Sequence, residues 1–361
     1  MAFSLTNLKD LANVAIKYNA SDIHLRTDEP PVLRIGSELV PVQSKSLSEI
    51  TIYEICAIIF TGHKYQGQVD KITEADGAFN IPDLCRVRFN FFKYTGRPGL
   101  VLRIISKEIP TIESLNLNPI IKNISNLSRG LVLVTGPTGC GKSSTLAAII
   151  NEINKKKAAH IITIEDPIEF VHPQIKSRLS QREVTIDTPT FAEGLRSALR
   201  QDPDVILIGE MRDAETISTA LSAAETGHLV LSTIHTKNTI ATITRIISMF
   251  SGEQQADIKK ALAENLQATI GQRLLKSEKG AGKMVAALEI MMMSPGIREC
   301  ILGEQELRSI TAIIERGSSN GGGQSFDQSI LDLFKRKIIS REVAAEEFSS
   351  PADFSQKLLI E

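Results

Sequence analysis

A short apolar run, LVLVT at 131–135, leads directly into the glycine-rich segment GPTGCGKSS at 136–144. This segment matches the pattern G-x-x-x-x-G-K-[ST], and an apolar helical pattern follows it over 146–153. A strand, a glycine-rich loop and a helix in this order form a phosphate-binding loop. The segment therefore predicts an α/β domain that binds the phosphates of a nucleotide.

Each residue type in this segment has a physical role. The glycines let backbone N–H groups approach the phosphates, and the start of the following helix adds a positive dipole. Lys142 neutralises charge on the β- and γ-phosphates, and the Ser143 hydroxyl can bind Mg²⁺. We therefore expect a nucleotide with β- and γ-phosphates and Mg²⁺ as ligands, and we assign nucleotide binding to Gly136, Pro137, Thr138, Gly139, Cys140, Gly141, Lys142, Ser143 and Ser144.

Three further β-rich apolar runs follow this loop, HIITI at 160–164, VILI at 205–208 and LVLST at 229–233. Helix-like segments long enough for crossovers separate them, and this alternation is typical of a parallel sheet that helices cover on both faces. Residues 254–350 read mostly as helices, with a strand expected at 284–290 and a flexible loop at 318–324.

Acidic side chains follow two of these runs. The segment ITIEDPIEFVH carries Glu165, Asp166 and Glu169, and the segment DVILIGEMRD carries Glu210 and Asp213. In open α/β sheets, ligands bind at the carboxyl ends of the strands. We therefore expect these carboxylates beside the phosphate loop.

Two of the carboxylates are assigned roles in hydrolysis. Gly209 stands where a magnesium-binding aspartate usually ends the strand, so Glu210 is expected to serve the metal itself or through a water molecule. Glu169 then remains the better candidate to orient and deprotonate the attacking water, a role worth roughly 10²- to 10⁴-fold in rate. The alternative stays open that Glu165, Asp166 and Glu169 only cap a loop and a helix.

His228 and His235 flank the run at 229–233. A neutral histidine beside a γ-phosphate can hydrogen-bond the phosphate or a catalytic carboxylate. A structural histidine at a strand end would give the same sequence pattern, so both interpretations stay open.

The first third of the chain has a different pattern. Apolar residues recur at helical spacing in 5–20 and in 49–60, whereas 32–42 is β-rich and interrupted by Gly36. Residues 85–105 contain two β-rich runs joined by a Gly/Pro turn, which predicts a hairpin. This part of the chain is therefore expected to be mixed α and β.

A length of 361 residues suggests two or three domains. The segment PTIESLNLNP between Pro110 and Pro119 favours turns and marks a connection. We therefore expect an N-terminal domain over 1–109, a linker over 110–119 and a second domain over 120–361.

The charge balance and the cysteines exclude several classes of partner and site. Forty-one basic against 42 acidic residues leave a formal charge of −1, which gives no reason to expect a nucleic-acid partner. The four cysteines lie far apart without a CxxC pair, so neither zinc nor a disulfide framework is indicated. The opening residues lack a signal-peptide pattern, and no uncharged apolar run approaches the roughly 18 residues that span a bilayer. We expect a cytoplasmic protein whose contact with a membrane is peripheral.

Five segments together resemble the type IV pilus retraction ATPases, the PilT family of the secretion and pilus ATPase superfamily. The segments are SDIHLRTDEPPVLRIG at 21–36, GPTGCGKSS, ITIEDPIEFVH, LRQDPDVILIGEMRD and TGHLVLSTIHT, and the similarity runs from about residue 5 to about residue 345. The resemblance implies a PAS-like mixed α/β domain followed by a RecA-like P-loop ATPase domain with C-terminal helices. It further implies a homo-hexamer that hydrolyses ATP to disassemble pilus fibres at the inner membrane, on a platform protein there.

The resemblance also implies roles for single residues. Glu169 is implied as the general base, Glu210 as acting at magnesium, and His228 and His235 as important for turnover. Members of the family bring arginines of the N-terminal domain to the phosphates, within or across subunits. Arg86, Arg88, Arg97 and Arg103 occupy the matching region, and we favour Arg97 and Arg103, although alternate arginines on a strand are commonly a solvated face.

One motif departs from the family. The retraction motif AIRNLIRE corresponds here to GIRECILG at 296–303, in which Leu302 and Gly303 replace the second arginine and the glutamate. The hypothesis of a retraction motor therefore competes with a second hypothesis, that the chain is an accessory or regulatory paralogue that assists another retraction ATPase. A pilus extension or type II secretion ATPase is disfavoured, because the expected longer N-terminal region and four-cysteine zinc module are not seen. A DNA translocase is disfavoured by the charge balance.

Overall fold

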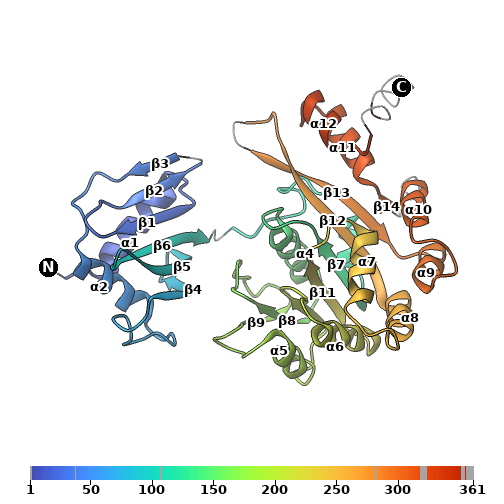
Figure 1. The fold of residues 1–361 in the computed structure, drawn as a ribbon, viewed down its shortest axis with the longest axis horizontal. Helices are drawn as coiled ribbons and strands as arrows, with labels where there is room; N and C mark the ends of the chain where they lie inside the picture. Colours follow the sequence, from blue (N-terminus) through green and yellow to red (C-terminus); the bar gives the residue numbers. More distant parts are fainter. Residues whose placement is uncertain are drawn as a thin grey trace. The chain divides into compact units, whose positions relative to one another are not determined.

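The computed structural model describes residues 2–36, 38–105, 108–280, 283–317, 323–350 and 354 (Figure 1). The chain divides into two units. Unit 1 comprises Met1–Glu108 and Pro167–Val171, and unit 2 comprises Ile109–Asp166 and His172–Glu361. The first division falls next to the expected end of the N-terminal domain, whereas Pro167–Val171 groups with unit 1 from inside the second expected domain.

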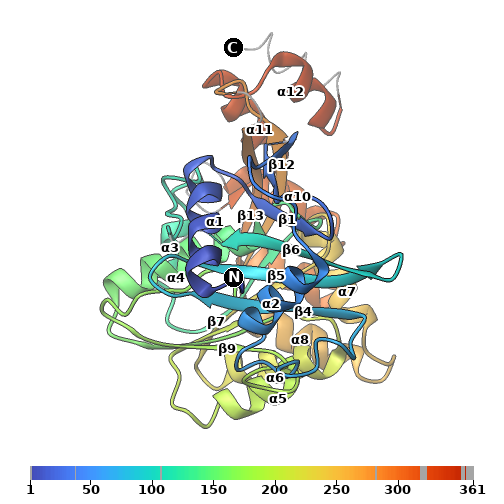
Figure 2. The same ribbon diagram turned by 90° about the vertical axis from the view of Figure 1, so that its left-hand side faces the viewer.

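Unit 1 is an antiparallel sheet with two helices. Its strands, in the spatial order β3-β2-β1-β6-β5-β4, are β1 Asp22–Arg26, β2 Val32–Ile35, β3 Glu38–Pro41, β4 Glu74–Ile81, β5 Cys85–Tyr94 and β6 Arg97–Ile105. The helices are α1 Leu5–Lys17 and α2 Glu49–Ile59 (Figure 2). The predicted helices, the strands on either side of Gly36 and the β5–β6 hairpin are confirmed.

Alternation along β5 explains how this sheet buries one face. Val87, Phe89 and Phe91 are fully buried, while the residues between them are exposed or half-buried. Because successive side chains of a strand point to opposite faces, Arg86 and Arg88 lie on the face away from the core.

Unit 2 contains an eight-stranded sheet in the order β14-β13-β12-β7-β11-β10-β8-β9. The strands are β7 Gly130–Thr135, β8 His160–Glu165, β9 Arg178–Glu183, β10 Val205–Ile208, β11 Leu229–Ile234, β12 Leu266–Lys276, β13 Met284–Met292 and β14 Gly323–Gln324. Neighbours from β12 through β9 are parallel, and β13 and β14 add antiparallel strands. The predicted parallel sheet is confirmed.

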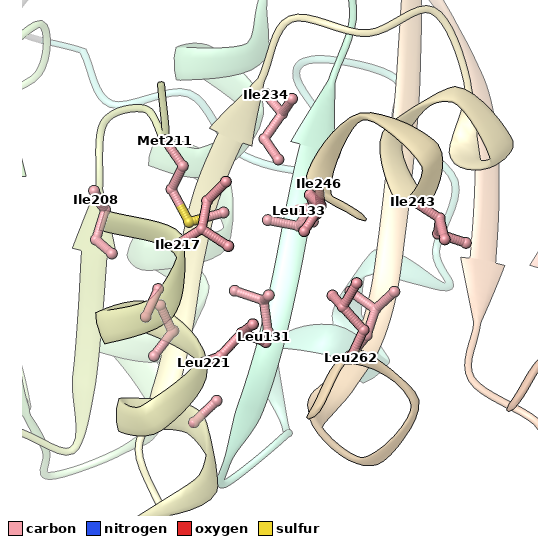
Figure 3. Close-up of a cluster of buried hydrophobic side chains, with 14 of the residues drawn as sticks. Leu131, Leu133, Ile208, Met211, Ile217, Leu221, Ile234, Ile243, Ile246 and Leu262 are labelled. Atoms are coloured by element: carbon pink, nitrogen blue, oxygen red, sulfur yellow. The ribbon is translucent and has the colours of Figure 1, made fainter. Parts of the chain in front are cut away.

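Helices cover both faces of this sheet. They are α3 Ile121–Ser125, α4 Lys142–Lys156, α5 Phe191–Ala198, α6 Ala214–Glu225, α7 Thr239–Ser248, α8 Gln255–Asn265, α9 Pro295–Leu302, α10 Ser309–Gly317, α11 Phe326–Lys335 and α12 Arg341–Glu347. Leu131 and Leu133 of β7 pack in the cluster that contains Ile217 of α6 and Leu262 of α8 (Figure 3). Val132 packs in a second cluster that contains residues of α3 and α4.

Three of the described strands of unit 2, β9, β12 and β14, were not expected. Residues 266–276 form the long strand β12, so the prediction of mostly helical structure there is wrong. β12 buries residues on both faces, and such a run cannot be told from a buried helix by its periodicity. β9 is an edge strand of polar sequence, RLSQRE, which offers no apolar alternation. Of the predicted glycine-rich loop at 318–324, residues 318–322 lie outside the described residues, and Gly323–Gln324 form the short strand β14, so the prediction of a loop is wrong for these two residues.

The four cysteines are free thiols and are buried. Within the described part of the chain, no helix combines the length and the apolar character that crossing a membrane requires.

Candidate nucleotide-binding site

The phosphate loop adopts backbone angles that require glycine. Gly136, Gly139 and Gly141 have φ of +147°, +79° and +88°, in the region that side chains disfavour. A Cβ atom on Gly136 would lie 2.4 Å from the backbone oxygen of Gln272 and 2.5 Å from Sγ of Cys140. The loop can therefore run this close to β12 only with glycine at 136.

Lys142 is the first residue of α4, and its side chain stays at the loop. Its Nζ atom donates hydrogen bonds to the backbone oxygens of Gly136 (3.0 Å) and Pro137 (2.9 Å), and the residue is only 8% exposed. Ser143 and Ser144 follow in the first turn of α4, where helical N–H groups lack intrahelical acceptors. A cation and free N–H groups at one helix start are suited to bind phosphate.

The remaining loop residues differ in exposure. Pro137, Thr138 and Gly139 are exposed, whereas Cys140 is buried. Burial raises the pKa of the Cys140 thiol, so this side chain stays protonated at neutral pH. Cys140 therefore contributes packing to the loop.

The strand register brings the loop together with two other segments. Thr135 of β7 pairs with Ile234 of β11, so Gly136 and His235 leave neighbouring strands side by side. Ile208 of β10 pairs with Ser232 of β11, so Glu210 follows at the same edge of the sheet. The expected meeting of strand ends is confirmed for these segments.

Glu210 lies in a network at this edge. Its side chain is 13% exposed, forms an ion pair with Arg212, and lies 3.5 Å from Nε2 of His235. The backbone is fixed because Met211 donates its N–H to the oxygen of Thr233 and the Thr233 hydroxyl donates to the oxygen of Gly209. The Glu210 carboxylate thus lies between the guanidinium group of Arg212 and the imidazole of His235.

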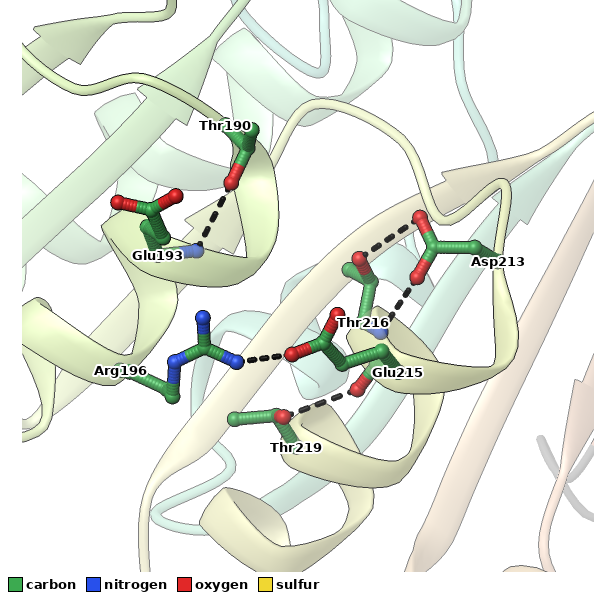
Figure 4. Close-up of polar contacts among 7 residues, drawn as sticks. All are labelled: Thr190, Glu193, Arg196, Asp213, Glu215, Thr216 and Thr219. Atoms are coloured by element: carbon green, nitrogen blue, oxygen red, sulfur yellow. Dashed lines mark hydrogen bonds and ion pairs between the residues drawn. The ribbon is translucent and has the colours of Figure 1, made fainter.

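Three neighbouring carboxylates have structural partners. Asp213 caps α6 by accepting hydrogen bonds from the N–H (2.8 Å) and the hydroxyl (3.1 Å) of Thr216, and Glu215 of the same turn pairs with Arg196 (Figure 4). Glu165 accepts from the Thr163 hydroxyl at 2.7 Å and from Gln181 at 3.2 Å. Glu210 is therefore the carboxylate of this edge that is best suited to a metal.

The donors fit magnesium. The Ser143 hydroxyl and the Glu210 carboxylate offer hard oxygens, and Mg²⁺ usually takes one or two protein ligands together with substrate phosphates. In the part of the chain that the structure describes, no three His, Cys, Asp or Glu side chains are grouped as a metal site of their own. A magnesium ion here would be held mainly by the nucleotide.

The chain resembles known proteins over almost its whole length. Residues 3–319 match the model of the family described as type II/IV secretion system protein. The chain belongs to this family. The family member PilT of Pseudomonas aeruginosa, a type IV pilus retraction ATPase, is 42% identical over 353 residues, which are 96% of this chain and 100% of PilT. The type IV pilus ATPase PilU of the same species is 34% identical over 343 residues, which are 95% of this chain and 89% of PilU.

A solved structure of a family member agrees with the fold. The pilus retraction motor PilT with bound ADP has a TM-score of 0.88 and 38% identity, and the match covers 97% of this chain and 99% of that one. The predicted fold class, a PAS-like mixed α/β domain before a RecA-like P-loop ATPase domain, is confirmed. The predicted membership of the PilT family, and with it the prediction of an ATPase, is also confirmed.

The structure separates the two histidines that the family motif places close in sequence. His228 precedes β11, and its Nδ1 atom lies 2.9 Å from the backbone oxygen of Ala223 and 3.2 Å from the Thr226 hydroxyl. Its own backbone oxygen accepts from Gly130, at the start of β7. His228 therefore lies at the end of the sheet opposite the phosphate loop of its own chain, whereas His235 lies at the same end as that loop. The roles of His228 and His235 in turnover stay predictions.

The remaining predicted residues belong to unit 1. Arg97 pairs with Asp28 at 2.7 Å, and Arg103 pairs with Asp22 at 2.8 Å. Both guanidinium side chains are more than half exposed. Glu169 lies in Pro167–Val171, which groups with this unit. The roles of Arg97, Arg103 and Glu169 stay predictions.

The sequence reasoning missed Gln272. This residue of β12 is 2% exposed, and its side chain hydrogen-bonds Cys140 of the loop and Thr145 of α4. No local signal marks it, because it lies more than a hundred residues after the loop in a segment expected to be helical.

Proposed function

We propose that the chain is the ATP-hydrolysing motor subunit of type IV pilus retraction. In this proposal it forms a homo-hexamer in the cytoplasm, peripherally attached to the inner membrane through a pilus platform protein. One observation carries the proposal, the common edge at which the phosphate loop, Glu210 and His235 meet in a chain that matches PilT over its full length. ATP is the substrate, and Mg²⁺ is its expected companion.

The proposed mechanism follows from the position of each group. Lys142 and the N–H groups of the loop bind the β- and γ-phosphates, and Ser143 and Glu210 would hold Mg²⁺, directly or through water. Magnesium would neutralise charge on the phosphate oxygens. His235 hydrogen-bonds Glu210 or the γ-phosphate. Glu169 deprotonates the attacking water, and Arg97 and Arg103 stabilise the transition-state charge, which is worth roughly 10³- to 10⁵-fold for a donated arginine.

A matched pair of variants on α4 tests the ATPase site. Lys142→Ala removes the cation at the loop, while Lys155→Ala removes an exposed cation from the last turn of the same helix. We expect phosphate release to fall to background for Lys142→Ala and to stay at the wild-type rate for Lys155→Ala. Undiminished turnover of purified Lys142→Ala protein would refute the assignment of the loop.

One feature of α9 supports a second candidate, an accessory ATPase that assists another retraction motor. The helix ends at Leu302, and Gly303 has a φ of +89°. The family's second arginine and glutamate are therefore replaced by an exposed leucine and a helix-terminating glycine.

Deletion of the gene in its host separates these functions by fibre number and surface motility. Hyperpiliated, non-motile cells support the retraction motor. Piliated cells with only weakened movement support the accessory role, and bald cells support an extension motor, which would overturn the proposal.

A further inference from the structure

Gln272 lies on the strand next to the phosphate loop. Gly271 of β12 pairs in parallel register with Thr135, the last residue of β7, so Gln272 stands beside the first residue of the loop. Its side chain is buried and comes from a part of the sequence far from the loop. The strand thus presents one buried amide to the loop.

This amide contacts the loop at several points. Nε2 of Gln272 donates to the backbone oxygen of Cys140 at 2.5 Å, and Oε1 accepts from the Thr145 hydroxyl at 2.7 Å. A Cβ on Gly141 would lie 2.9 Å from Nε2, and a Cβ on Gly136 would meet the backbone oxygen of Gln272. One residue therefore touches the start of the loop, its end and the first turn of α4.

A glycine-rich loop needs such a partner. Its glycines have large conformational freedom, and this freedom must be lost before the N–H groups can converge on a phosphate. The Cys140 carbonyl accepts its hydrogen bond from Gln272 of β12, so its oxygen is turned toward that strand and not toward a bound phosphate. A loop already held in this form binds its ligand with a smaller entropic cost.

We propose that Gln272 is a positioning residue that holds the phosphate loop in its nucleotide-binding conformation through the Cys140 carbonyl and the Thr145 hydroxyl. Thr145 is fully buried, so its hydroxyl acts through Gln272 and not on the nucleotide. The inference rests on the proposed role of the loop, and it adds a residue outside the loop that sets nucleotide affinity.

The test measures the Kd for Mg·ADP by calorimetry, and the Tm without nucleotide, in variants of the full chain. Gln272→Met keeps the length of the side chain and removes both hydrogen bonds. The control Thr269→Val alters the same strand, where the fully buried Thr269 shares a hydrogen bond with Thr239. Thr269 pairs with Leu133, before the end of β7, and its side chain points to the opposite face of the sheet from that of Gln272. We expect Gln272→Met to raise the Kd roughly tenfold, since a buried carbonyl and hydroxyl lose their partner. Thr269→Val should lower the Tm and leave the Kd within about twofold.

A second pair keeps the test decisive if Gln272→Met does not fold. Thr145→Val removes the hydroxyl that donates a hydrogen bond to Gln272, and Thr145→Ser retains it. The inference requires weaker Mg·ADP binding by Thr145→Val and near wild-type binding by Thr145→Ser. Wild-type affinity in Gln272→Met, or equal affinities in the two Thr145 variants, would overturn it. Failure of the wild-type protein to bind Mg·ADP would instead remove the proposed function.

Discussion

Among single residues, Glu169 and Glu210 carry different parts of the proposed chemistry. Glu169→Gln keeps the size of the side chain and removes its basicity, so we expect phosphate release to fall roughly 10²- to 10⁴-fold while the Kd for ATP stays within a few-fold. Glu210→Gln should instead weaken the dependence of ATP binding on Mg²⁺. Single-turnover phosphate release and equilibrium binding distinguish the two. Equal loss of binding and hydrolysis in Glu169→Gln would indicate a structural carboxylate.

A buried histidine makes the stability depend on pH. Burial lowers the pKa of His172 to about 4, from an ordinary value of 6.5, so the folded protein holds this imidazole neutral. Between pH 6.5 and pH 4 the unfolded chain binds a proton at this imidazole that the folded chain does not, and this favours unfolding. The free energy of unfolding is therefore unaffected by His172 above pH 6.5 and decreases as the pH falls toward 4. Across this window the decrease in the free energy of unfolding approaches about 3 kcal/mol.

Urea unfolding of the wild type and of His172→Leu at pH 7 and pH 5 measures this contribution. The midpoint of the wild type should fall more between the two pH values than the midpoint of the variant. Equal falls in both proteins would show that other groups govern the acid sensitivity.

The sequence sufficed for those site residues that follow the ends of parallel strands. Glu210 was expected beside the loop that carries Lys142 because such ends meet at one edge, and the register places it there. His235 reaches the same edge, but its sequence pattern left a structural interpretation equally open. His228 shares a short motif with His235, but the six residues of β11 separate their strand ends by roughly 20 Å. Gln272 could not be foreseen, because its contact with the loop depends on a strand neighbour distant in sequence.

Among the elements, α9 has a sharply defined end. The N–H of Gly303 donates to Cys300 and Glu299, and the N–H of Glu304 donates to Glu299, which satisfies carbonyls of the last turn. Gly303→Ala places a side chain at φ of +89° and should cost about 1 kcal/mol of unfolding free energy. Gly252→Ala is the matched control, because Gly252 is exposed and has no positive φ, and a Cβ atom there would meet no other atom within 4 Å. Denaturant midpoints check both, and an equal cost at the two sites would refute the strain argument.

Elements were foreseeable where the apolar pattern has a single period. The alternation of β5 and the helical spacing of α1 each leave one buried face, and both were expected. β12 is buried on both faces, and β9 pairs as a polar edge strand, so only tertiary pairing defines them.

For the whole molecule, the proposed ring requires sites completed by neighbouring subunits. If Arg97 or Arg103 acts across a subunit boundary, ATPase activity per subunit should rise with protein concentration as rings form. Steady-state phosphate release over a dilution series, with the mass followed by light scattering, measures both quantities. A constant specific activity in a monomeric sample would contradict the ring mechanism.

A mixing experiment locates the arginine within that ring. Arg97→Ala subunits keep an intact phosphate loop, and Lys142→Ala subunits keep Arg97. In a ring assembled from equal amounts of these two inactive variants, an arginine donated in trans restores roughly a quarter of the sites, because half of the subunits have an intact loop and half of those have a competent neighbour. An arginine that acts on its own subunit's nucleotide restores none, because every chain then lacks one required group.

Arg88→Ala, on the face of β5 away from the core, serves as the matched control and should retain activity without mixing. Activity that reappears only on mixing Arg97→Ala with Lys142→Ala therefore assigns Arg97 to the neighbouring site, and its absence in assembled rings confines the residue to its own subunit or to its ion pair with Asp28.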